Sequence, residues 1–169
     1  MSHAPVMPAE PVVAFEWPGN VRAEVAEAIS HYPVERSAVL PLLWIAQRTW
    51  GWVPPGALKL VAHTLTLDET EVFGIATFYT MFNLRPVGRH HLQVCMTLSC
   101  SLMGADRLFK HLENKLGIGH GETTADGRYT LRRVECLAAC GMAPCLQANL
   151  DYHENLDEAK ADALLEKLK

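Results

Sequence analysis

Four cysteines in the C-terminal half of the chain stand in two pairs whose spacing is typical of a metal centre. Cys95 and Cys100 are separated by four residues, and Cys136 and Cys140 by three. Thiolates are the usual ligands of iron–sulfur clusters, and four of them hold a [2Fe–2S] or a [4Fe–4S] unit. Four cysteines also close a tetrahedral zinc site, although zinc sites favour pairs with two intervening residues. The spacing therefore favours iron–sulfur and leaves zinc as the alternative.

The fifth cysteine, Cys145, follows Ala143 and Pro144. We interpret it as a small buried hydrophobic residue rather than a fifth ligand, because the other four already make a complete set. Disulfides are disfavoured, since the segment MSHAPVMPAEPVV lacks the charged and apolar regions of a secretory signal. We therefore expect a reducing, cytoplasmic compartment.

Short predicted elements would bring the two cysteine pairs together. The pattern predicts strands at 91–94, 129–134 and 145–148 and amphipathic helices at 105–116 and 156–168. The order β-α-β-β-α predicts a small α/β layer with helices packed on a sheet. Cys95 follows the first strand and Cys136 follows the second. Two loops at one end of such a sheet can direct four sulfurs at one volume.

The chain before the cysteines has a different pattern. Residues 1–18 are rich in proline, and we expect an extended arm. From residue 19 the pattern is helical, with helices predicted near 21–31, 39–50, 54–63 and 68–79. The breaker segment Arg85-Pro86-Val87-Gly88 marks our domain boundary, giving a helical bundle at 19–85 and a second domain at 86–169. All 5 cysteines follow that boundary.

Composition excludes several classes of function. The chain has 169 residues, of which 49% are hydrophobic and 20% charged, the balance of a folded protein. A net charge of −4 implies no general affinity for nucleic acid. The longest apolar run, 40–46, is too short to span a bilayer. No dinucleotide fingerprint, Walker A sequence or hydrolytic constellation is present, and we interpret His90 and His91 as strand residues rather than metal ligands.

Several segments besides the cysteine pairs are characteristic of one family. They are GWVP at 51–54, GIATFY at 74–79, PVGR at 86–89, VECLAACG at 134–141 and YHENL at 152–156. Together they resemble the thioredoxin-like [2Fe–2S] subunit of respiratory complex I, which is the E-type subunit of bacterial NADH:quinone oxidoreductase. The resemblance runs from about Val21 to the C-terminus. Position 145 departs from it, because the family usually has an aliphatic or similar residue there.

The resemblance implies a fold and a ligand set. The fold is α+β, an N-terminal helical bundle followed by a thioredoxin-like α/β domain that carries the cluster, so 86–169 becomes the [2Fe–2S] ferredoxin domain. The four cluster ligands of the family correspond to Cys95, Cys100, Cys136 and Cys140.

The resemblance also implies a role as an electron-transfer subunit of NADH:quinone oxidoreductase, non-catalytic and without a substrate site of its own. Single electrons would pass between the cluster and FMN, with FMN and NADH held by a partner flavoprotein, the F-type subunit. Further complex I subunits would complete a peripheral arm at the cytoplasmic face of the inner membrane. Similar subunits occur in soluble NAD-dependent formate dehydrogenases and bifurcating hydrogenases. The alternative of another class is a zinc-stabilised scaffold subunit without redox function.

Overall fold

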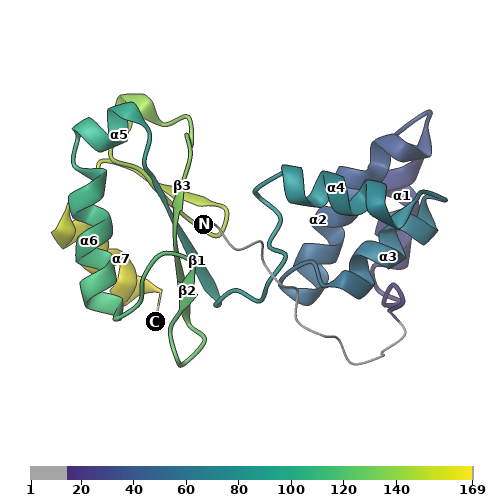
Figure 1. The fold of residues 1–169 in the computed structure, drawn as a ribbon, viewed down its shortest axis with the longest axis horizontal. Coiled ribbons are helices and arrows are strands. Elements are labelled where there is room, and N and C mark those ends of the chain that lie inside the picture. The colour runs from purple at the N-terminus through teal and green to yellow at the C-terminus, as the bar shows by residue number, and fades with distance from the viewer. Residues whose placement is uncertain (1–14, 169) are drawn as a thin grey trace. The chain divides into compact units, whose positions relative to one another are not determined.

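The computed structural model describes residues 15–168, and the first fourteen residues of the predicted arm lie outside that range. The chain divides into two compact units, one ending at Pro86 and the other beginning at Val87 (Figure 1). The first unit is helical and the second is built on a sheet. No helix within residues 15–168 is long and apolar enough to cross a membrane.

The helical unit contains all the helices that the apolar spacing predicts. They are α1 (Arg22–Ser30), α2 (Val39–Trp50), α3 (Pro55–Thr64) and α4 (Glu69–Phe78), with one unpredicted 3-10 turn, η1 (Glu35–Ala38). Gly51 ends α2 in the left-handed conformation, with a φ of 79°. Asp68 caps α4, where its carboxylate accepts a hydrogen bond of 2.7 Å from the N–H of Thr70.

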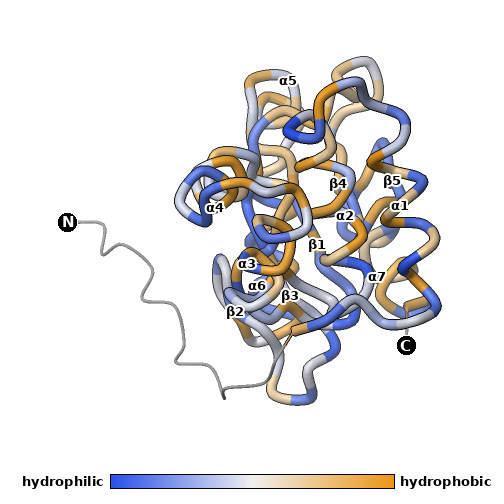
Figure 2. The backbone as a smooth tube through the Cα atoms, turned by 90° about the vertical axis from the view of Figure 1, so that its right-hand side faces the viewer, coloured by the Kyte–Doolittle hydropathy of each residue, from blue (hydrophilic) through white to orange (hydrophobic). Residues whose placement is uncertain are grey.

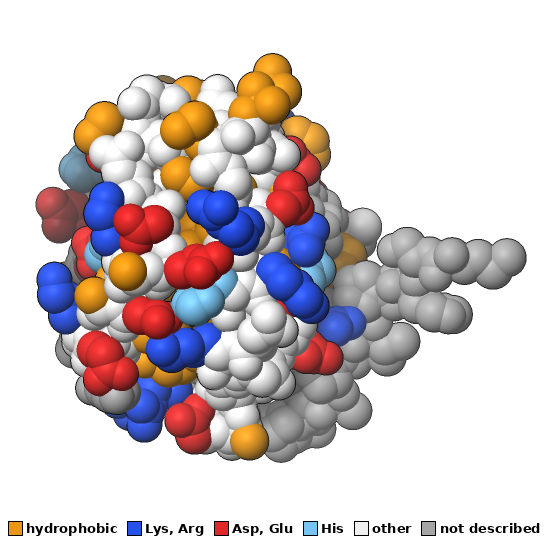
Figure 3. Space-filling view, turned by 90° about the vertical axis from the view of Figure 1, so that its left-hand side faces the viewer, with side chains coloured by type: hydrophobic (Ala, Val, Ile, Leu, Met, Phe, Trp, Pro, Cys, Tyr) orange, Lys and Arg blue, Asp and Glu red, His pale blue; other side chains and the backbone are white. Residues whose placement is uncertain are grey.

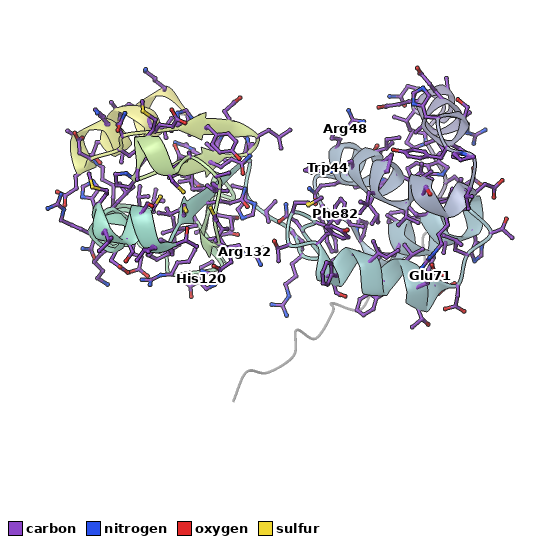
Figure 4. All side chains as sticks on the ribbon, turned by 90° about the horizontal axis from the view of Figure 1, so that it is seen from above. Trp44, Arg48, Glu71, Phe82, His120 and Arg132 are labelled. Atoms are coloured by element: carbon purple, nitrogen blue, oxygen red, sulfur yellow. The ribbon has the colours of Figure 1, made fainter. Side chains whose placement is uncertain are left out.

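Aromatic residues contribute to the core of this unit. The rings of Trp44 and Phe82 lie side by side with centroids 5.5 Å apart (Figure 4). Trp17, which we assigned to the extended arm, is buried, and its Nε1 donates a hydrogen bond of 2.9 Å to Thr64 Oγ1. The described end of the arm therefore packs on the helices.

The second unit is a five-stranded mixed sheet with the strand order β2-β3-β1-β4-β5. The strands are β1 (His90–Cys95), β2 (Glu122–Thr123), β3 (Tyr129–Val134), β4 (Leu146–Ala148) and β5 (Asp151–His153). In the centre, β1 runs parallel to β3 and antiparallel to β4. The two-residue strand β2 was not predicted, because it is too short to show a periodic pattern.

Two helices pack against one face of the sheet, α6 (Ala105–Leu116) and α7 (Glu158–Lys167) (Figure 1). Phe109 of α6 and Leu165 of α7 join a buried core with Leu92, Val94 and Leu131 of the strands. Orange and blue residues alternate along the helices in Figure 2, as expected for elements that bury one side. Helices followed by a helix-covered sheet confirm the α+β fold class.

The parallel register places both cysteine loops at one end of the sheet. Cys95 pairs with Val134, so the last residues of β1 and β3 lie beside each other. Cys136 comes two residues after Val134.

At the opposite end of these strands, the N–H of Gly88 donates a hydrogen bond of 2.6 Å to Thr130 Oγ1. A Cβ at position 88 would lie 2.8 Å from the carbonyl carbon of Tyr129, so the close approach requires glycine.

Candidate metal centre

The four predicted ligands lie on two short loops beyond β1 and β3. Cys95 ends β1, and Cys100 lies in the five-residue helix α5 (Leu98–Leu102), which the sequence pattern did not reveal. Cys136 follows β3, and Cys140 begins the 3-10 turn η2 (Cys140–Met142). Figure 1 shows α5 at the end of the sheet where β1 finishes.

The first pair is buried and its two thiols interact. Cys95 and Cys100 are each 2% exposed. The thiol of Cys100 hydrogen-bonds the sulfur of Cys95, so Cys95 is the member of the pair better suited to carry negative charge. Burial raises the pKa of Cys100, the N–H of Cys145 opposes that rise, and nearby Cys95 and Cys140 add to it.

Hydrogen-bond donors converge on Cys95 from both loops. Burial by itself raises the pKa of the Cys95 thiol, but donors outweigh it and hold that pKa below its ordinary value. The donors are the side chain of Thr97, the N–H of Leu137, the N–H of Thr97 and the thiol of Cys100. The Leu137 N–H belongs to the second loop, so the two loops are adjacent.

The second pair is exposed to solvent, unlike the first. Its loop is shaped by Ala138, which adopts a left-handed φ of 61° and donates its N–H to Cys136 Sγ over 3.3 Å. Cys140 lies close enough to Cys100 for its charge to raise the pKa of that thiol. The loop therefore presents its sulfurs outward while its backbone contacts the buried pair.

The four sulfurs share one end of the sheet without closing on a single point. Among residues 15–168, no three His, Cys, Asp or Glu side chains are close enough together to hold a metal ion. The donor chemistry nevertheless fits an iron–sulfur cluster, because four thiols and several N–H and O–H donors to sulfur are present at one location. Each iron of a [2Fe–2S] cluster takes two cysteine ligands, so the cluster requires two pairs of thiols at one location rather than three ligands around one ion.

Cys145 is fully buried, as predicted. Its carbonyl accepts a hydrogen bond of 3.1 Å from the N–H of Cys95, and its own N–H contacts Cys100. Burial raises the pKa of the Cys145 thiol to about 11, with smaller contributions from Cys100 and Cys95. The backbone of Cys145 thus contacts both buried cysteines, while its side chain packs in the core.

Exposed apolar side chains surround the cysteine loops. They are Leu98 and Leu102 of α5, Met103 and Met142, which we call the apolar rim. Figure 3 shows hydrophobic side chains along the upper edge of the molecule, the side of α5, above a face dotted with charges. Large exposed apolar groups at one edge mark a surface suited to protein contact.

The Thr97 hydroxyl was missed by sequence reasoning. A threonine two residues after a cysteine has no distinctive spacing, and only the bend from β1 into α5 turns its side chain back to sulfur.

Together, the fold and the thiols define a small α/β protein with an attached helical unit and a thiolate site suited to an iron–sulfur cluster. The family model for the thioredoxin-like [2Fe–2S] ferredoxin matches residues 25–169. The chain belongs to that family.

Known relatives match over most of their length. One of them, the E-type subunit 2 of the NADH-quinone oxidoreductase of Rhizobium meliloti, is 50% identical over 147 residues, which covers 87% of this chain and 88% of that protein. The E-type subunit of the NADH-quinone oxidoreductase of Rickettsia prowazekii is 50% identical over 141 residues, covering 82% and 80%.

A solved structure also resembles the chain. An NAD+-reducing [NiFe]-hydrogenase in the air-oxidized state superimposes with a TM-score of 0.66 and 27% identity. The match covers 75% of this chain but only 22% of the hydrogenase chain.

Proposed function

We propose that this chain is an electron-transfer subunit of an NADH:quinone oxidoreductase, complex I, in which Cys95, Cys100, Cys136 and Cys140 hold a [2Fe–2S] cluster. The observation that carries the proposal is the meeting of two thiol pairs at one end of the parallel β1–β3 pair, in a member of a [2Fe–2S] family. When bound, such a cluster takes up and releases one electron at a time.

The two cysteine pairs would hold the cluster in different ways. Cys95 and Cys100 supply buried thiolates on a rigid strand and helix, and hydrogen bonds to Cys95 favour its charged form. Cys136 and Cys140 supply the outer thiolates from the exposed loop. This arrangement keeps one side of the site inside the protein and turns the other toward a partner.

The electron source lies on another chain. No nucleotide-binding motif is present in the sequence, so we assign FMN and NADH to a partner flavoprotein, the F-type subunit. The chain itself is non-catalytic in this account. Further complex I subunits would place it in the peripheral arm at the cytoplasmic face of the membrane.

Two exposed surfaces suit this partner. One is the apolar rim around the cysteine loops, and the other lies on and after α4, where Phe78 is 77% exposed and Phe73 and Tyr79 are also exposed. Aromatic residues and methionine are enriched at the cores of protein interfaces. We infer that the flavoprotein covers both.

A second candidate is the equivalent subunit of a soluble NAD-dependent enzyme. The likeness to the NAD+-reducing [NiFe]-hydrogenase favours it. A soluble NAD-dependent formate dehydrogenase is of the same kind. Both candidates share the cluster and the flavoprotein partner and differ in what receives the electrons.

Co-purification from native extract tests the proposal. The tagged chain should co-purify with a flavin-containing partner. A quinone-reducing membrane complex in the same fraction would support the first candidate, and a hydrogenase would support the second. NADH should reduce the cluster only when the flavoprotein is present. Isolation of a free chain that binds no flavoprotein on reconstitution would refute the subunit assignment.

A matched pair of variants locates the docking surface. Leu102→Ser should weaken capture of the flavoprotein, because Leu102 belongs to the apolar rim and is 78% exposed. Leu150→Ser is the control, since Leu150 is 63% exposed but lies in the turn between β4 and β5, at the other end of the sheet. Equal capture by both variants would exclude the rim as the docking site.

A further inference from the structure

Thr97 begins helix α5 but does not use its hydroxyl to cap it. Threonine at this position ordinarily accepts a hydrogen bond from an N–H in the first turn of its helix. Here the side chain makes no such bond. Its Oγ1 lies instead 3.2 Å from Cys95 Sγ, a close contact between a hydroxyl and a sulfur.

The direction of this hydrogen bond follows from the chemistry of a ligand. A cysteine bound to iron is a thiolate and has no proton to give. The hydroxyl of Thr97 must then donate and the sulfur of Cys95 must accept. Hydrogen bonds to an ionised acceptor are stronger than neutral ones, so the contact strengthens when Cys95 is charged.

The two buried cysteines receive unequal support. Cys95 has the Thr97 hydroxyl, the Thr97 N–H and the Leu137 N–H as donors. Cys100, by contrast, has the N–H of Cys145 as its backbone donor. A substitution at Thr97 removes only the hydroxyl, because the two N–H donors belong to the backbone and Cys100, as a ligand, has no proton to donate.

We propose that Thr97 is a positioning residue whose hydroxyl donates a hydrogen bond to Cys95 and thereby raises the reduction potential of the cluster. This inference rests on the proposed function, because it assumes that Cys95 is a cluster ligand. Reduction adds one negative charge to the iron–sulfur unit, and a donor to a ligand sulfur stabilises the reduced form more than the oxidised form. Loss of the hydroxyl therefore makes reduction harder without removing a ligand.

The test compares variants of the full, cluster-loaded chain by redox titration followed in the visible and electron paramagnetic resonance spectra. Thr97→Val keeps the branched shape and removes the hydroxyl, whereas Thr97→Ser keeps the hydroxyl. Ser101→Ala is the matched control, because it removes a hydroxyl from the same helix that contacts Asp106 at 3.3 Å rather than sulfur. Iron content is measured for each protein.

We expect Thr97→Val to shift the midpoint potential to a more negative value and to alter the spectrum of the reduced protein. Thr97→Ser and Ser101→Ala should keep the wild-type potential. In the wild-type protein, the iron–sulfur stretching bands in the resonance Raman spectrum should shift in deuterated water, and Thr97→Val should reduce that shift.

Two results would overturn the inference. One is a wild-type potential in loaded Thr97→Val. The other is loss of iron from Thr97→Val while Thr97→Ser and Ser101→Ala load fully, which would make Thr97 a residue required for assembly. Absence of iron from the wild-type chain would instead refute the proposed function itself, so the two failures are distinguishable.

Discussion

Acidification from pH 7.5 to pH 5.5 should destabilise the chain through one buried imidazole. His91 lies on β1 and is 6% exposed. Its Nε2 has no hydrogen-bond partner among the described residues. Burial, with a smaller contribution from Arg132, lowers the pKa of His91 from 6.5 to about 4. The folded protein therefore keeps this imidazole neutral.

The size of the effect follows from the two pKa values. The unfolded chain binds a proton at this site near pH 6.5, and the folded chain only near pH 4. Between those values the unfolded state binds more protons, so stability is present above pH 6.5 and falls as the pH falls. The full loss is about 3 kcal/mol, and the part between pH 7.5 and 5.5 is about 1.4 kcal/mol.

Urea unfolding at the two pH values measures this loss. His91→Leu should lose about 1.4 kcal/mol less than the wild type on acidification, because its side chain takes up no proton. His31→Gln, which removes an exposed imidazole at the end of α1, is the control for the loss of a histidine side chain. An equal pH dependence in wild type and His91→Leu, or a His91 proton resonance that titrates near pH 6.5, would refute the reasoning.

Four further substitutions test the packing of the second unit by chemical unfolding. Gly88→Ala should destabilise it by about 1–3 kcal/mol, because the new Cβ meets the backbone of Tyr129 at 2.8 Å, while Gly141→Ala, with nothing within 4 Å, should be nearly neutral. Ala138→Gly should stabilise by roughly 0.5–1 kcal/mol by relieving the left-handed backbone. Tyr129→Phe should cost about 1–2 kcal/mol, since its hydroxyl donates to the Leu165 carbonyl at 3.0 Å. The opposite ranking of the two glycine variants, destabilisation by Ala138→Gly, or no cost for Tyr129→Phe would contradict the respective arguments.

Much of the fold could be predicted from local patterns. The helices of the first unit follow from the spacing of apolar residues and from end signals such as Gly51 and Asp68, and the structure contains them. The spacing of residues in the sequence does not determine which group a polar side chain pairs with in the fold. Glu71 has the spacing of a capping box with Asp68, yet its carboxylate is paired with Arg36 of η1. That contact joins residues far apart in the sequence, so the local sequence pattern does not predict it.

The sequence singles out the candidate ligands but says less about how they are arranged in space. Cysteine spacing singled out the two pairs, because few other patterns place thiols so regularly. Their common location depends on the parallel pairing of β1 with β3, which periodicity alone does not reveal. The left-handed Ala138 and the turned Thr97 hydroxyl arise from tertiary constraints on the two loops. The residue types at positions 97 and 138 do not predict either conformation.

Iron analysis of the five single Cys→Ala variants tests the central claim most directly. The anaerobically purified wild type should contain about two irons per chain and give an electron paramagnetic signal only when reduced. Substitution of Cys95, Cys100, Cys136 or Cys140 should abolish or cripple cluster assembly, whereas Cys145→Ala should retain the cluster. Stoichiometric zinc in place of iron, or loss of iron from Cys145→Ala with retention in Cys140→Ala, would contradict the account.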